Sequence, residues 1–299
     1  MSDSMGTLDQ DELAADMQFG DMLTRVSFQP GIMLGSAALT AEQSYHLRRL
    51  TRHQRWLIGP GTVFGLRVDV ITPPDDATDV RLTVTPGYAI DGLGREVLVS
   101  EAYAISLRDW LAAENASPGI AGAYVAGTLF LRVTVRSRAC PQSLQPVVAE
   151  LFDAGLDPVV PARIGDSFLL EVTGDAKQTG DAPARPLDWW SPGRATPAAT
   201  DVPGTVTARE QTTISGETNP DLASTLKLQA WLLRQTLPPF DDSPGAEAGY
   251  EEAARLLLAS VHVTLATLTT APTTPGTSVN NLVRPFVSPN VLLAALSLP

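Results

Sequence analysis

The chain has 299 residues, of which 44% are hydrophobic and 18% are charged, a balance that is typical of folded proteins and excludes wholesale disorder. Its formal net charge of −12 disfavours general binding to nucleic acids or anionic membranes, because both require basic surface. A single cysteine, Cys140, excludes an internal disulfide and favours a reducing compartment.

Residues 1–39 are predicted to form an acidic N-terminal arm followed by an extended segment. Six acidic residues precede the first basic residue, Arg25. A secretory signal begins in the opposite way, with basic residues and then an apolar core. No apolar run approaches the roughly 18 residues that cross a bilayer. We therefore expect a cytoplasmic protein without membrane insertion.

A helix is predicted over residues 41–58. Thr40 is the expected N-cap, and Gln43 three residues later completes a capping box. The sequence Gly59-Pro60-Gly61 is expected to end the helix.

The two faces of this helix differ in composition. At helical periodicity one face carries Leu47, Leu50, Leu57 and Ile58, with Gln43 and Gln54 among them. The opposite face carries Tyr45, Arg49, Arg52 and Trp56. Arginine and aromatic residues are frequent hot spots of protein interfaces, so the second face is a candidate contact surface. The alternative is that its aromatic residues pack on the chain's own sheet while its arginines pair with nearby carboxylates.

Residues 40–173 are predicted to form a β-rich domain. Alternating apolar residues indicate strands near residues 63–70, 80–84, 89–90, 97–99, 128–135 and 167–172, with a short helix near 109–114. The sequence Asp91-Gly92-Leu93-Gly94 is a strong hairpin signal. The expected fold is mainly β with α, an α+β arrangement in which a β-sandwich or small barrel is capped by the N-terminal helix.

The composition changes after residue 173. Residues 174–222 are rich in Gly, Pro, Thr, Ala and Asp, which predicts a linker or long loop. Trp189 and Trp190 are its aromatic anchor and further interface candidates. Residues 223–299 are predicted to be a C-terminal helical region, with helices near 221–235 and 246–268.

Six glycines are expected to be required by the backbone: Gly59, Gly61, Gly65, Gly87, Gly92 and Gly94. Gly65 interrupts an apolar strand, where a bulge or a close backbone approach is the usual reason for glycine. Gly87 follows Pro86 in a pair suited to a type II turn with positive φ.

No catalytic, cofactor or metal site emerges from the residues. His46 and His53 lie about two helical turns apart and cannot chelate one metal as an i,i+4 pair can. His262 stands alone, and the carboxylates, Asp91 among them, fall at turns. We therefore expect a protein that is not an enzyme and needs no cofactor. A glycosidase-type pair of carboxylates stays open, because separation in sequence does not report separation in space.

Five segments together resemble a family of bacterial proteins. They are Phe28–Leu34, Leu39–His46, Arg52–Val68, Val84–Glu96 and Asp157–Phe168. They look like the N-terminal module of proteins encoded among the genes of phage-tail-like particles and contractile injection systems. The resemblance covers about residues 26–173 and departs from the family at the insertion Gly35-Ser36-Ala37-Ala38.

This resemblance implies a structural subunit near the baseplate of a contractile particle. Its expected partners are other baseplate or tail subunits and further copies of itself, with no nucleic acid. The family supplies no catalytic residues to carry over. The alternative function is a carbohydrate-active or polymer-degrading enzyme associated with a tail.

Overall fold

The computed structural model describes residues 22–31, 34–76, 79–146, 159–175, 208–219, 222–223, 226 and 252–287. The helices are α2 (Ser36–His53), its π-helical continuation η1 (Gln54–Ile58), α3 (Leu107–Glu114), α4 (Pro118–Ala123) and α5 (Ala208–Gly216). The strands are β1 (Gly61–Gly65), β2 (Val68–Ile71), β3 (Arg81–Val84), β4 (Gly87–Ile90), β5 (Glu96–Val99), β6 (Tyr103–Ser106), β7 (Tyr124–Val125), β8 (Thr128–Pro146), β9 (Val159–Gly174), β10 (Leu256–Thr264) and β11 (Thr277–Asn280).

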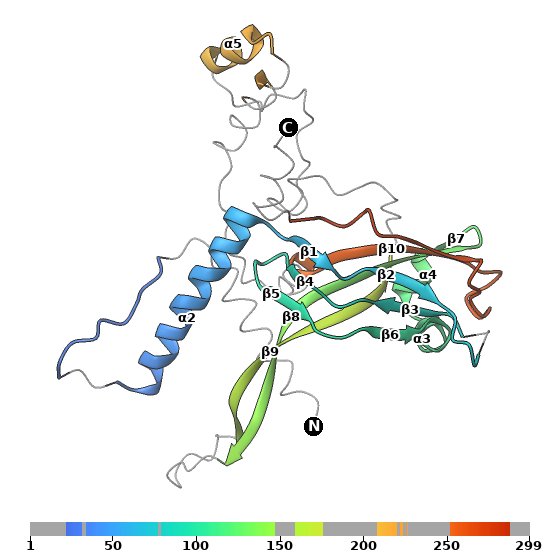
Figure 1. The fold of residues 1–299 in the computed structure, drawn as a ribbon, viewed down its shortest axis with the longest axis horizontal. Helices are drawn as coiled ribbons and strands as arrows, with labels where there is room; N and C mark the ends of the chain where they lie inside the picture. The colour runs from blue at the N-terminus through green and yellow to red at the C-terminus, as the bar shows by residue number, and fades with distance from the viewer. Residues whose placement is uncertain are drawn as a thin grey trace.

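The described strands form three antiparallel sheets (Figure 1). Two small sheets have the orders β1-β4-β5 and β2-β3-β6, and the largest has the order β11-β10-β8-β7 with β9 also paired to β8. The mixed, mainly β architecture expected from the sequence is confirmed.

The two small sheets are built from the same three stretches of chain. Each stretch places one strand in one sheet and then bends into the other, as between β1 and β2 at Gly65 and Leu66. Both residues have positive φ there, +66° and +53°. Across the bend, the Leu66 amide donates to the Pro86 carbonyl at 3.2 Å. Residues 63–70, expected as one strand with a bulge, therefore form two strands.

One continuous hydrophobic core joins the two small sheets to the large one. In β8, Leu129, Leu131, Val133 and Val135 are buried because alternate residues of a strand face the same side. Leu66 and Val68 contribute from the first bend, and Leu111 contributes from α3.

The helix expected over residues 246–268 is wrong at residues 256–264, which form β10. This strand pairs with β8 on one side and with β11 on the other, and Leu256, Leu258, Val261 and Val263 are buried. A short apolar run is compatible with either a buried strand or a helix, and here pairing with β8 decides for the strand. In the helix expected near 221–235, only residues 222–223 and 226 are described, and they are helical.

Several other expectations lie wholly or partly outside the described residues. These are the acidic arm over residues 1–21, most of the stretch 174–222 and the tryptophans Trp189 and Trp190. Within 174–222, residue 174 ends β9 and residues 208–216 form α5.

The N-terminal helix begins earlier than expected. Its N-cap is Gly35, whose carbonyl accepts from the Ala38 and Leu39 amides at 3.1 and 3.3 Å, and no side chain caps the helix. The cap expected at Thr40 is therefore wrong, because residues 36–39 continue the helix in the N-terminal direction. The end of the helical stretch at Ile58 is confirmed, and Gly59 follows with φ +88°.

The outer edge of β1 is covered by the segment that follows β11. Thr62 donates from its amide to the Pro285 carbonyl at 2.9 Å and accepts from the Val287 amide at 3.0 Å. Arg284 is buried and donates to the Gly65 and Leu66 carbonyls at 3.2 and 2.9 Å. Burial lowers the pKa of Arg284 to about 10.

Candidate functional site

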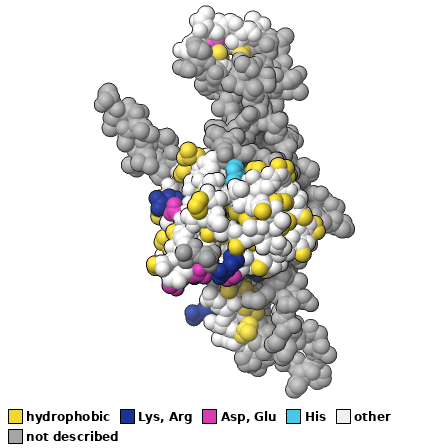
Figure 2. Space-filling model, turned by 90° about the vertical axis from the view of Figure 1, so that its right-hand side faces the viewer, with side chains coloured by type: hydrophobic (Ala, Val, Ile, Leu, Met, Phe, Trp, Pro, Cys, Tyr) yellow, Lys and Arg dark blue, Asp and Glu magenta, His cyan; other side chains and the backbone are white. Residues whose placement is uncertain are grey.

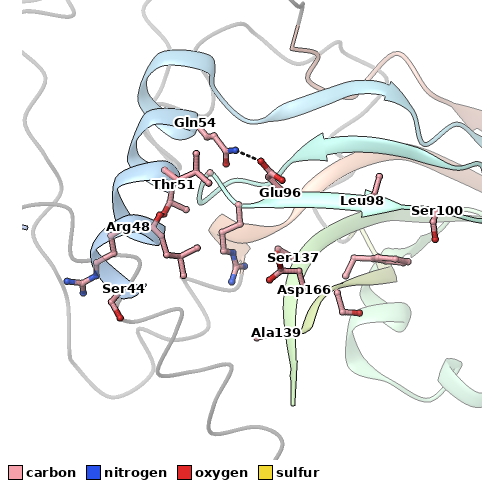
Figure 3. Close-up of a pocket in the computed structure, with 16 residues that line it drawn as sticks. Ser44, Arg48, Thr51, Gln54, Glu96, Leu98, Ser100, Ser137, Ala139 and Asp166 are labelled. Atoms are coloured by element: carbon pink, nitrogen blue, oxygen red, sulfur yellow. Dashed lines mark hydrogen bonds between the residues drawn. The ribbon is translucent and has the colours of Figure 1, made fainter. Parts of the chain in front are cut away.

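A cleft of about 580 Å³ lies between α2, β5 and the base of the β8–β9 hairpin. Figure 3 shows Ser44, Arg48 and Thr51 of α2 on one side and Ser137 and Asp166 of the hairpin on the other. Its apolar lining consists of Leu47 and Leu50 of α2, Leu98 of β5 and Phe168 of β9. Its charged lining consists of Arg48, Arg95, Glu96 and Asp166. The cleft therefore offers apolar walls with a few charges of both signs.

The end of the helix anchors α2 to the hairpin that joins β4 and β5. The Gln54 amide nitrogen donates to Glu96 Oε1 at 2.8 Å, and Arg55 Nη1 donates to the Gly92 carbonyl at 2.6 Å. Arg55 is 2% exposed, and this burial lowers its pKa to about 10 although nearby Asp91 acts in the opposite direction. One wall of the cleft is thus fixed at its base.

Asp91 organises the turn beneath this anchor. Its Oδ1 accepts from the Leu93 and Arg95 amides, both at 2.9 Å, and its Oδ2 accepts from Arg95 Nε at 2.9 Å. The Ser137 amide of β8 donates to the same Oδ2 at 3.3 Å. A residue expected only to shape a turn therefore also ties the hairpin to the large sheet. The signal that could have indicated this is the arginine four residues after the aspartate.

The six glycines have different local reasons. Gly59, Gly65 and Gly94 have positive φ. An added Cβ at Gly61 would lie 2.9 Å from the Phe286 backbone, and one at Gly92 would lie 1.7 Å from the Ala253 carbonyl oxygen. The positive φ expected at Gly87 is not found. A Cβ there would instead lie 2.4 Å from the Phe64 carbonyl oxygen, so close approach at the bend between the sheets excludes a side chain.

The leucine face of α2, which continues into η1 at Leu57, is largely exposed. Leu39, Leu47, Leu50 and Leu57 are 54%, 52%, 51% and 74% exposed, and Thr51 is the only buried residue of α2. The capping contact with the β-rich domain is therefore confined to the last turn of α2 and to η1. Sequence reasoning placed the contact surface on the opposite face and did not identify these leucines as exposed.

The arginine and aromatic face is only partly exposed. Arg49 is exposed, whereas Tyr45, Arg52 and Trp56 are half-buried. The Tyr45 ring makes an edge contact with His46 at 5.3 Å, and the Arg55 guanidinium lies 5.6 Å from the Trp56 ring centre. These are contacts between neighbouring residues of the helix, so they do not decide between a surface for a partner and packing on the chain's own sheet.

The β8–β9 hairpin projects beyond the sheets as a two-stranded ribbon (Figure 1). Its register is constant from Leu131 opposite Gly174 to Pro146 opposite Val159, with an interruption at Ser143 (φ +55°), but β10 pairs with β8 only as far as Val135. We call residues 138–146 and 159–167 the ribbon arm. It carries exposed apolar side chains, Leu144 at 68% and Ile164 at 55%.

A further apolar row crosses the outer face of the sheet β1-β4-β5. Phe64 lies opposite Tyr88, and Tyr88 lies opposite Leu98. The Phe64 and Tyr88 rings stack with their centres 6.2 Å apart, while Phe64 and Leu98 are 61% and 62% exposed. Because Leu98 also lines the cleft, this row extends the apolar surface of the cleft across the sheet.

Figure 2 shows the side of the molecule remote from α2. In Figure 2 its hydrophobic side chains are dispersed, and its charged side chains form a few small clusters.

The histidines occupy separate environments. His46 bonds Glu42 at 3.1 Å on the surface of α2, whereas His262 of β10 contacts the Phe130 ring with centres 4.9 Å apart. Within the described part of the chain, no three His, Cys, Asp or Glu side chains gather as a metal site would require. None of the described helices is long and apolar enough to cross a membrane.

Comparison with protein-family models finds no match for this chain, and comparison with curated proteins finds no significant relative.

Proposed function

We propose that this chain is a structural subunit of a contractile injection system or phage-tail-like particle, at or around the baseplate. In this proposal it works by contact rather than catalysis, in the cytoplasm as part of the assembled particle. Its partners are other baseplate or tail subunits and further copies of itself. The resemblance of residues 26–173 to proteins of such gene clusters supports the kind of particle.

The observation that carries an assembly role is the exposed leucine face of α2. Fully burying an exposed leucine side chain contributes about 1.5–3 kcal/mol, so covering the exposed half or more of each of these four leucines would favour association. An isolated helix shorter than about 12–15 residues is marginal in water, and longer ones draw most of their stability from packing. Because only Thr51 of α2 is buried, packing against the described residues contributes little to its stability, and contact with a partner would contribute more.

The ribbon arm supports the same role. A two-stranded hairpin alone is marginally stable, and a third strand or a packed face is needed for independent stability. The arm lies beyond the reach of β10 and presents Leu144 and Ile164 to solvent. Two elements of one molecule therefore carry apolar side chains that the chain's own core does not use.

The proposal is tested by deleting the gene in its native host. Negative-stain images of sedimented particles are compared with and without the gene, and mass spectrometry measures whether the chain sediments with sheath and tube proteins. We expect the chain in the particle fraction and incomplete particles in its absence. Normal particles without the gene, together with a chain found only in low-mass fractions, would contradict the assembly role.

One observation favours the alternative enzymatic function. The cleft contains two carboxylates, Glu96 and Asp166, as a glycosidase requires. However, Glu96 is engaged by the Gln54 amide at 2.8 Å, which Figure 3 shows as the dashed contact. Hydrolysis of cell-wall or capsular polymer that is lost in both Glu96→Gln and Asp166→Asn would establish the enzyme instead.

A further inference from the structure

We propose that the ribbon arm of one copy inserts into the cleft between α2 and β5 of a second copy of this chain. The inference rests on the proposed assembly role and names one partner for it. The inserted part is the outer part of the arm, residues 140–146 and 159–165, which lies outside the cleft lining, so the contact is between unlike surfaces. Such contacts close as reciprocal dimers or rings, or continue as filaments.

The arm of the same molecule cannot fill this cleft. The base of the ribbon, including Ser137, Ala139 and Asp166, already forms one wall of the cleft. From there the register stays constant to Pro146 opposite Val159, and the ribbon extends away from the sheets (Figure 1). An arm that enters the cleft must therefore come from another molecule.

The apolar side chains of the arm match the walls of the cleft. Along the arm, Pro141 lies opposite Ile164 and Leu144 lies opposite Pro161, which gives two apolar cross-strand pairs. The walls are formed by the leucines of α2 on one side and by Leu98 and Phe168 on the other. A ribbon lying between these walls can bury apolar contacts against both, as the core of a protein interface requires.

The charges are complementary as well. The arm carries the exposed Arg163 next to Ile164, and the cleft carries the carboxylates of Glu96 and Asp166. Of the two cleft cations, Arg48 and Arg95, Arg95 is already paired with Asp91. Two copies each carry a net charge of −12 and therefore repel one another at a distance. Attraction between Arg163 of the arm and the carboxylates of the cleft would offset part of this repulsion and favour one register of the contact.

The backbone of the ribbon offers a further contact. In the described residues β8 has no strand on its second side beyond Val135, so its peptide groups there can pair with an added strand. A visiting arm that lies along this edge would extend the two strands to a wider sheet. That addition supplies the third strand that a stable ribbon needs.

Disulfide trapping between two separately labelled copies tests the contact. Both copies carry Cys140→Ser, which removes the native thiol; one copy adds Leu50→Cys and the other adds Ile164→Cys. Mixing under oxidising conditions should yield a disulfide-linked dimer that contains one copy of each kind. The matched control replaces Ile164→Cys by Leu282→Cys, an exposed leucine outside the arm and the cleft. A mixed-dimer yield no greater than that of the control overturns the inference.

Two further measurements test the contact: the dissociation constant for self-association, measured by analytical ultracentrifugation, and disulfide trapping between copies with reversed charges. Leu144→Lys with Ile164→Lys should raise the apparent dissociation constant for self-association by about tenfold or more, since apolar anchors dominate interface energy. Arg163→Glu should reduce trapping, and mixing it with a cleft partner that carries Asp166→Arg should restore it. A wild-type chain that stays monomeric up to its solubility limit overturns the inference.

The two proposals fail in different ways. The arm variant Leu144→Lys with Ile164→Lys is also assayed for its occupancy in sedimented particles. If disulfide trapping fails but this variant is lost from particles, the arm contacts a different subunit, so self-insertion is overturned while the assembly role stands. If trapping succeeds but the chain is absent from particles, self-insertion stands and the proposed particle is wrong.

Discussion

The Nε atom of Arg95 donates to the Oδ2 atom of Asp91 at 2.9 Å, in a place where Asp91 is completely buried and the Arg95 side chain is 10% exposed. The same carboxylate accepts three backbone amides, one of them from Ser137 of β8. One acidic side chain thus connects the β4–β5 hairpin to the large sheet through Arg95 and Ser137, which both line the cleft.

Asp91→Asn should strongly destabilise the protein. An asparagine amide has one acceptor oxygen in place of two, and its NH2 group is a donor. In one orientation this NH2 group faces the Arg95 side chain and the Ser137 amide, and in the other it faces the Leu93 and Arg95 amides, so in both orientations donors meet donors. Breaking a buried ion pair typically costs about 3–5 kcal/mol in the free energy of unfolding. Urea denaturation measures this loss. The control is Asp109→Asn in the exposed Arg108–Asp109 pair, which should cost clearly less because solvent screens this pair. Equal losses would mean that Asp91 has no special role.

Gly94→Ala should destabilise the contact between α2 and the hairpin. Gly94 has φ +87°, and an added Cβ would lie 2.4 Å from the Thr51 carbonyl oxygen. Gly31 has nearly the same φ, +89°, but no atom lies within 4 Å of its Cβ position. Gly31→Ala therefore carries the backbone strain alone, about 1–2 kcal/mol at most. Thermal unfolding should show a clearly larger loss for Gly94→Ala, and similar losses would mean that the close approach to Thr51 is unimportant.

Asp79 should make stability depend on acid pH. Its carboxylate accepts from Ser106 Oγ and Arg81 Nε, each at 2.6 Å, and these bonds hold its pKa below the ordinary value of 3.8. Because the unfolded chain then binds a proton more readily, this stabilisation is present above pH 3.8 and is lost as the pH falls through the folded-state pKa. The difference in unfolding free energy between the wild type and Asp79→Asn should shrink as the solution is acidified below about pH 4. A difference that does not vary with pH would contradict this role.

The arginine face of α2 should affect assembly without affecting folding. Arg49→Glu with Arg52→Glu reverses charge on the first contact surface predicted from the sequence, and we expect slower incorporation into particles, because charges at a rim mainly set the encounter rate. Circular dichroism should show an unchanged fold. If this variant is incorporated at the wild-type rate, the face serves only the monomer.

Local signals predicted part of the fold well. The Asp91-Gly92-Leu93-Gly94 turn joins β4 and β5 as expected, and the helical stretch ends before Gly59. Both depend on turn and capping chemistry that acts within a few residues. The strand β10 could not be predicted in this way, because its partner β8 lies more than a hundred residues earlier in the chain.

The candidate site was predicted only in part, for a related reason. The spacing of Leu47, Leu50 and Leu57 correctly placed them on one face of a helix, but an apolar face does not specify whether its partner is the same chain or another. The sequence also predicted strands that are shorter than β8 and β9, because alternating apolar residues mark only the part of each strand that is buried in the core. The outer part of the ribbon carries mixed residues such as Gln142 and Arg163, whose pairing does not depend on burial in the chain's own core.

The leucine face of α2 provides the most direct test of the assembly role. Leu47→Lys with Leu50→Lys is introduced into the full chain, and its occupancy in sedimented particles is measured by quantitative mass spectrometry against the wild type. Leu282→Lys is the control, since Leu282 is 74% exposed and lies outside the cleft. We predict that the double variant folds but is lost from particles while the control is retained. Wild-type occupancy of the double variant would contradict the account.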